Sequence, residues 1–349
     1  AKKMPSTSNA FTLIQAPAAM KKELPDSTTL LKEVIAANNK PVTPYTEKAI
    51  VTTLLANAPA AGKVTNESVN EKLNTTNLVL SNGVTISIKP TTLKNDEIQM
   101  DAWRWGGYHK FPVADKDNAT NAATLIQQMG VRDLSPIDLR KFMAGKTVFV
   151  SPYLNADEEG IEGRSSVKDF ETFLQLVYLY FTQPRKDESL FKSFINNQKA
   201  SLQFISKDPS ASYQDTLQKI VYNNNPWADG IPKPEDYDRI SLDRVMEIYK
   251  SVFSNAYGMH FTFVGNIDPQ QAKPLLEKYL GSLPASSKEN TYTDVGQRLI
   301  TGETDITLKR GKEPKAMINL FFEGQAEYNR DNRLRLAALL EVLNIRIIE

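Results

Sequence analysis

The chain has no cysteine, only two histidines and no long hydrophobic run, and each absence narrows its possible functions. Without cysteine there is no disulfide, no thiolate nucleophile and no cysteine-bound metal. No stretch of about 18 apolar residues occurs, so we expect no membrane span. The net charge of +1 gives no electrostatic case for binding nucleic acid. The rest of the composition is that of an ordinary globular protein: 41% of the 349 residues are hydrophobic, enough for the cores of two domains.

Residues 1–74 have the pattern of a tail followed by a connecting segment. Apolar residues recur at helical spacing over 27–38, with Ser27 as the expected N-cap. Three prolines and an Ala/Asn/Gly-rich stretch at 56–62 follow and are typical of a linker.

Residues 75–285 predict one complete α+β domain. Two alternating strands over 78–88 flank Asn82-Gly83, a pair that favours a tight hairpin turn. Further strands are expected at 97–106, 147–154, 159–166 and 259–264, and amphipathic helices occupy most of the remainder. A block of strands followed by a block of helices predicts a mostly antiparallel sheet packed by helices.

After residue 290 the pattern of strands and a helix begins again. We expect strands at 303–308 and 316–322 and a helix from about Asn329, whose apolar pattern runs to Ile347 near the end of the chain. The sequence therefore predicts that 290–349 is the truncated start of a second, similar domain.

Five segments together resemble the pitrilysin/insulinase family of zinc metallopeptidases, the inverzincins. They are the hairpin Leu80-Ser-Asn-Gly-Val-Thr-Ile, the stretch Ala102-Trp-Arg-Trp-Gly-Gly, the helix 121–129, Ser241-Leu-Asp-Arg-Val-Met-Glu-Ile-Tyr and Phe261-Thr-Phe-Val-Gly-Asn-Ile-Asp. The resemblance lies in their order and spacing over about 75–285. It implies a clamshell-type α/β sandwich with a repeated domain, in which two halves close around an unfolded peptide.

The resemblance also implies that this chain is the non-catalytic half. The family helix that carries His-x-x-Glu-His matches 121–129, where Thr124, Gln127 and Gln128 occupy the motif positions. The family takes a third ligand, a glutamate, from a later helix, but 189–222 contains no glutamate. Hydroxyl and amide groups are poor Zn²⁺ ligands beside imidazole and carboxylate. We therefore expect no catalytic residue and no metal in this chain.

By the same resemblance, residues 1–74 are the end of a preceding domain and the linker between the two halves. The expected partners are the N-terminal catalytic half of the same polypeptide, which would hold Zn²⁺, and a peptide substrate. The expected function is to wall the proteolytic chamber and to hold the peptide, by side-chain pockets or by adding a strand at a sheet edge that contains 97–106 or 147–154. The expected location is the periplasm or cell envelope. One alternative is a metal-free structural or interaction subunit of the same fold.

Other residues allow more than one interpretation. Trp103 and Trp105 share one side of a strand, so that with Gly106 and Gly107 they either contact substrate or serve ordinary sheet packing. His109 and His260 could form a metal site if they met, making the chain itself a hydrolase; otherwise each bonds locally. A last sequence feature is an acidic cluster that either binds a cation or forms a solvated turn: Asp157, Glu158, Glu159 and Glu162.

Overall fold

The computed structural model describes residues 11, 13–41, 51–205, 208–228, 230–287, 290–309, 316 and 318–348, and divides into two units. The first unit, Ala1–Ala49, contains a 3-10 helix, η2 (Ala18–Lys22), and α1 (Ser27–Asn39). The side chain of Asp26 accepts a hydrogen bond from Thr29 N at 2.7 Å, so Asp26 rather than Ser27 is the N-cap. Within the described residues, no helix combines the length and the hydropathy needed to cross a membrane.

The second unit, Ile50–Glu349, is built on one seven-stranded sheet. Its strands are β1 (Val64–Asn70), β2 (Thr75–Leu80), β3 (Thr85–Pro90), β4 (Ile98–Trp105), β5 (Val148–Leu154), β6 (Glu158–Ser165) and β7 (His260–Gly265). The order across the sheet is β1-β2-β3-β7-β4-β6-β5, and every neighbouring pair is antiparallel except β3–β7. The predicted fold class, α+β with a mostly antiparallel sheet packed by helices, is confirmed.

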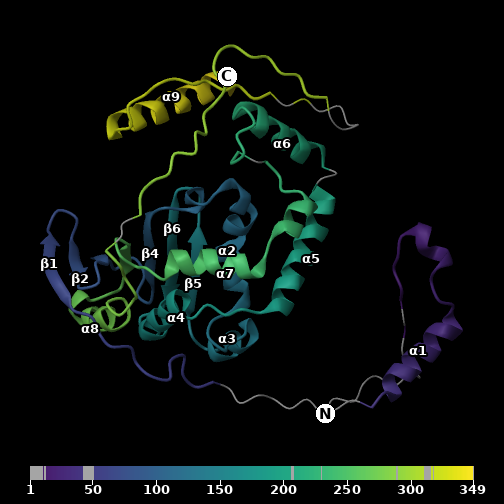
Figure 1. Cartoon of the computed structure of the whole chain (residues 1–349), viewed down its shortest axis with the longest axis horizontal. Helices are drawn as coiled ribbons and strands as arrows, with labels where there is room; N and C mark the ends of the chain where they lie inside the picture. The colour runs from purple at the N-terminus through teal and green to yellow at the C-terminus, as the bar shows by residue number, and fades with distance from the viewer. Residues whose placement is uncertain are drawn as a thin grey trace. The chain divides into compact units, whose positions relative to one another are not determined.

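Helices lie against one face of this sheet and enclose the core (Figure 1). The α-helices of this unit are α2 (Lys116–Met129), α3 (Pro136–Phe142), α4 (Phe170–Thr182), α5 (Glu188–Ile205), α6 (Pro209–Val221), α7 (Leu242–Phe253), α8 (Pro269–Tyr279) and α9 (Arg330–Ile348). Short 3-10 turns are η3 (Tyr108–Lys110), η4 (Val113–Asp115) and η5 (Pro234–Arg239). Alternate side chains of the strands are buried on the side covered by α2 and α4, whereas the intervening side chains form the other, open face.

Local sequence explains several of these elements. Asn82-Gly83 turns β2 into β3, with Gly83 at φ +80°, a conformation that glycine adopts without strain. Ser135 and Asp138 form a capping box that starts α3, with Pro136 at its first position.

Three expectations about strands need correction. The edge strand was expected to contain 97–106 or 147–154; β4 lies between β7 and β6 and is fully paired, whereas β5 is an edge of the sheet. β1 falls in the segment interpreted as a linker, yet it pairs with β2 along its length. Among the described residues, 303–308 form no strand, and neither do 316 and 318–322. The boundaries of the three proposed domains stay a prediction.

Candidate functional site

The three positions matched to the zinc motif lie on α2 but form no metal site. One side of α2 is buried, including Ala122, Leu125 and Ile126. Thr124 and Gln128 are exposed and Gln127 is half-buried. No imidazole or carboxylate replaces them, and no group of three or more His, Asp or Glu suited to a metal ion occurs among the described residues. The donor set on α2 does not fit Zn²⁺.

The two histidines have separate local partners. Nδ1 of His109 is 2.9 Å from Oδ1 of Asp157, and its buried ring meets Trp227 edge-on. Nδ1 of His260 is 2.8 Å from Oγ1 of Thr85 on the neighbouring strand. Burial lowers the pKa of His260, which favours its neutral form. The geometry gives each imidazole a local hydrogen bond and does not join them in a hydrolytic site.

The acidic turn is not uniformly solvated, which corrects one interpretation of the sequence. Glu159 is fully buried, with its Oε1 2.7 Å from Nη2 of Arg104 and 2.6 Å from Nδ2 of Asn290. Lys110 binds its other oxygen. Arg104 also donates to the carbonyl of Val252 at 2.7 Å. These side chains form a buried charge network that joins β4, β6, η3 and α7 to the chain beyond 290.

The sequence held a signal for this network. Arg104 and Glu159 pair directly across β4 and β6, and each has the parity of the core-facing residues of its strand, such as Ala102 and Ile161. Opposite charges at facing core positions predict a buried ion pair once the pairing of the strands is known.

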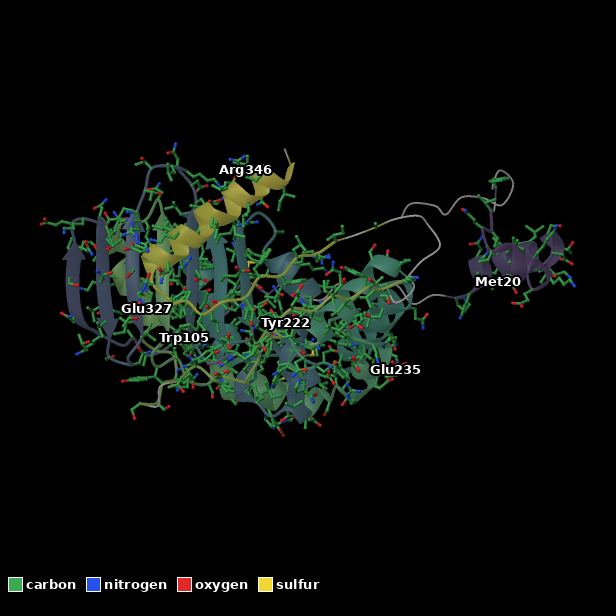
Figure 2. All side chains as sticks on the ribbon, turned by 90° about the horizontal axis from the view of Figure 1, so that it is seen from above. Met20, Trp105, Tyr222, Glu235, Glu327 and Arg346 are labelled. Carbon is green, nitrogen blue, oxygen red and sulfur yellow. The ribbon has the colours of Figure 1, made fainter. Side chains whose placement is uncertain are left out.

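Trp103 and Trp105 do share the open face, as the alternation indicated. Their rings meet edge-on with centroids 5.6 Å apart. Trp105, which is labelled in Figure 2, is 47% exposed. Tyr292 adds a third ring, 6.2 Å from Trp105. Exposed aromatic rings suit apolar peptide groups. A substrate contact at these two residues stays a prediction.

Gly106 and Gly107 have a packing function in the structure, because both are buried. Gly107 has φ +71°, and a Cβ there would lie 2.3 Å from the carbonyl oxygen of Ala156. A Cβ on Gly106 would lie 2.7 Å from the carboxylate of Glu159. The pair therefore allows the chain after β4 to lie against the β5–β6 turn.

β5 is the edge strand beside this region. The carbonyl of Thr147 accepts from Ser166 N at 3.0 Å, and Asn155 N donates to Glu158 at 2.8 Å. Because orientation alternates along a strand, the backbone groups of Val148 and Val150 point away from β6. In the described part of the chain no other strand pairs with this edge, so it could accept an added one.

Comparisons with known proteins match this chain to peptidases. Residues 239–344 match the family model described as the Peptidase M16 inactive domain. The chain is 23% identical over 248 residues to a "Zinc protease PQQL-like" from Arabidopsis thaliana, covering 70% of this chain and 23% of that protein. It is 23% identical over 308 residues to the "Probable zinc protease PqqL" of Escherichia coli (strain K12), covering 83% and 31%.

A solved structure shares the fold. The crystal structure of the periplasmic protease PqqL from Escherichia coli superposes with a TM-score of 0.66 at 19% identity, covering 85% of this chain and 32% of that one. The match of residues 239–344 to the Peptidase M16 inactive domain and the similarity to zinc proteases confirm the resemblance to this class of metallopeptidases. Within that class, the chain is homologous to PqqL-like zinc proteases. It spans about a quarter to a third of the length of these relatives.

Proposed function

We propose that this chain is the non-catalytic, substrate-chamber half of a zinc-dependent metallopeptidase that acts on unfolded peptides. The match of residues 239–344 to the Peptidase M16 inactive domain carries the proposal. Thr124, Gln127 and Gln128 support it, because they supply neither the ligands nor the general base that zinc peptide hydrolysis needs. The catalytic half, with its Zn²⁺, would be an N-terminal part of the same polypeptide, and the location would be the periplasm or cell envelope.

Two surfaces of the domain suit an unfolded peptide. The open face of the sheet presents Trp103 and Trp105, and the outer edge of β5 presents backbone groups that an extended peptide could pair with. Both bind a chain by its extended backbone and side chains without cleaving it. The proposed function of the domain is therefore to hold the peptide while another domain performs the chemistry.

The experiment compares binding with turnover for the 349-residue chain. Fluorescence anisotropy with labelled unstructured peptides should show saturable binding, and mass spectrometry of the same mixture should show intact peptide with or without added Zn²⁺. Peptide cleavage that a chelator abolishes would overturn the proposal in favour of a hydrolase. Binding of no peptide up to millimolar concentration would also overturn it.

The parent reading frame separates the proposal from the scaffold alternative. A His-x-x-Glu-His helix upstream of Ala1, together with one Zn²⁺ per full-length protein, is the expected result. A full-length protein with no such helix and no bound Zn²⁺ would instead make the domain a structural or interaction subunit.

A further inference from the structure

The open face of the sheet contains a row of small polar residues that runs at right angles to the strands. Strand pairing places these side chains opposite one another, each on a different strand. They are Asn77, Ser87, Thr262, Asp101, Glu162 and Ser151. We call this row the transverse channel.

Larger side chains two residues away along several of the strands form two walls, the second of which is interrupted by Gly160 on β6. Phe149, Arg164 and Val264 stand on one side. Tyr153, Trp103 and His260 stand on the other. A hollow of about 460 Å³ lies over the channel, bordered by Asp101, Glu162, Thr262 and the first wall. The central part of the transverse channel, beside the first wall, is therefore a depression in the open face.

The dimensions of the channel favour an extended chain over a helix. Wall residues on one strand are four positions apart, or about 13 Å between Cα atoms, and their side chains narrow this gap. A helix with its side chains needs about 10–12 Å, whereas an extended backbone needs about 5 Å. Six strands span about 24 Å, the length of roughly seven extended residues. The hydroxyl and amide groups of the floor can bond the backbone of such a peptide.

The charges of the channel floor are both negative and lie side by side. Asp101 and Glu162 are directly opposed on β4 and β6, where like charges repel. Among the described residues, neither carboxylate has a lysine or arginine within 4 Å; the hydroxyl of Tyr153 is 3.5 Å from Asp101. Arg164 lies over the ring of Phe149 instead, 5.6 Å from its centre. Partial burial raises the pKa of Asp101, which also indicates a site that would gain from a cation.

We propose that the transverse channel binds an extended peptide with a lysine or arginine side chain placed between Asp101 and Glu162. This inference rests on the proposed function and names the class of peptide that the open face selects. The basic group would lie beside both carboxylates, and Trp103 and Tyr153 would contact the aliphatic part of the side chain or the next residue. The complementarity of charge fixes both the position and the sign of the preferred residue.

The test uses the 349-residue chain and three labelled nine-residue peptides that differ only in a central lysine, glutamine or glutamate. Anisotropy should show the lysine peptide binding about fivefold tighter than the glutamine peptide, with the glutamate peptide weakest. Raising the salt concentration should reduce the difference. The variant Glu162→Lys brings the charge of the two facing residues from −2 to zero and should abolish the preference for the lysine peptide. Glu235→Lys makes the same charge change at an exposed position on the helical side, far from the strands (Figure 2), and should leave the order unchanged.

The outcomes separate this inference from the function on which it rests. Equal binding of the three peptides would overturn the basic preference and leave the peptide-holding function in place. Binding of no peptide would overturn both. Stoichiometric Ca²⁺ binding without any peptide preference would assign the two carboxylates to a metal and overturn the inference. Because Glu162 is exposed and its replacement relieves the repulsion with Asp101, Glu162→Lys should fold, and a urea midpoint no lower than that of the unmodified chain checks this.

Discussion

Removing the carboxylate of Glu159 should strongly destabilise the domain, although Glu159 is not part of the transverse channel. Its side chain is fully buried and accepts hydrogen bonds from Arg104, Lys110 and Asn290. In Glu159→Leu the guanidinium of Arg104, which is only 4% exposed, would be left buried without its counter-charge. Breaking a buried pair in this way costs about 3–5 kcal/mol, because the remaining charge cannot return to water.

Urea unfolding followed by tryptophan fluorescence measures this loss. With a slope of roughly 3 kcal/mol per molar urea, the midpoint should fall by about 1–1.7 M. Glu162→Gln is the matched control: it removes a carboxylate three residues further along β6, but from the exposed face. It should change stability by less than about 0.5 kcal/mol.

A double-mutant cycle shows whether the loss belongs to the pair. Arg104→Met alone should also destabilise, because Arg104 donates to the carbonyls of Val252 and Tyr257. The double variant Arg104→Met/Glu159→Leu should lose about 2 kcal/mol less stability than the two single losses added together. A Glu159→Leu midpoint close to that of the unmodified chain, or a strictly additive cycle, would refute the buried charge network.

Three further predictions concern other parts of the fold. Hydrogen bonds from Arg244 hold the pKa of Asp115 below its usual value, so Asp115→Asn should cost about 1 kcal/mol at pH 7. Since the depressed pKa gives its full contribution to stability above about pH 4, the unfolded value, that difference should shrink below this pH and disappear as the pH falls through the folded pKa in urea titrations. Gly107→Ala should be at least about 2 kcal/mol more destabilising than Gly145→Ala in thermal or urea unfolding, because both have positive φ but only Gly107 has backbone within reach of a Cβ. Val148→Pro removes an N–H at the outer edge of β5, so it should change peptide affinity less than twofold if the transverse channel is the binding surface.

Each of these has a result that would contradict it. A stability difference for Asp115→Asn that persists at pH 2 would show that the ion pair with Arg244 is not its cause. Equal effects of the two alanine substitutions would mean that the chain after β4 relaxes away from the β5–β6 turn. A severalfold loss of affinity in Val148→Pro would move peptide binding from the face of the sheet to its edge.

Local signals in the sequence predicted most of the elements correctly. Asn82-Gly83 predicted the β2–β3 hairpin, and the strands expected at 147–154 and 159–166 are β5 and β6. β1 was missed because its residues, Val-Thr-Asn-Glu-Ser-Val-Asn, show no apolar alternation: all but the first are exposed, so the strand buries almost nothing. Its stability comes from pairing with β2, which a hydrophobic pattern does not report.

The order of the strands could not be predicted from the sequence, for a different reason. β7 follows β4 by about 155 residues, yet it lies between β3 and β4 and pairs with both. Such non-local pairing turned β4 from an expected edge into a central strand. The transverse channel and the buried charge network depend on the same pairings, so neither could be found while only the parity of each strand was known.

Two glutamates of β6, Glu159 and Glu162, have opposite effects on the stability of the fold. Glu159 faces the core, where Arg104 and Lys110 neutralise it and bind the sheet to the surrounding elements. Glu162 faces the open side opposite Asp101, in an arrangement that costs stability because like charges are directly opposed. A fold selected for stability alone would place a neutral or basic residue at one of these two positions. The uncompensated pair is therefore better explained by a cation that arrives from outside the chain, whereas the compensated charge of Glu159 is part of the fold itself.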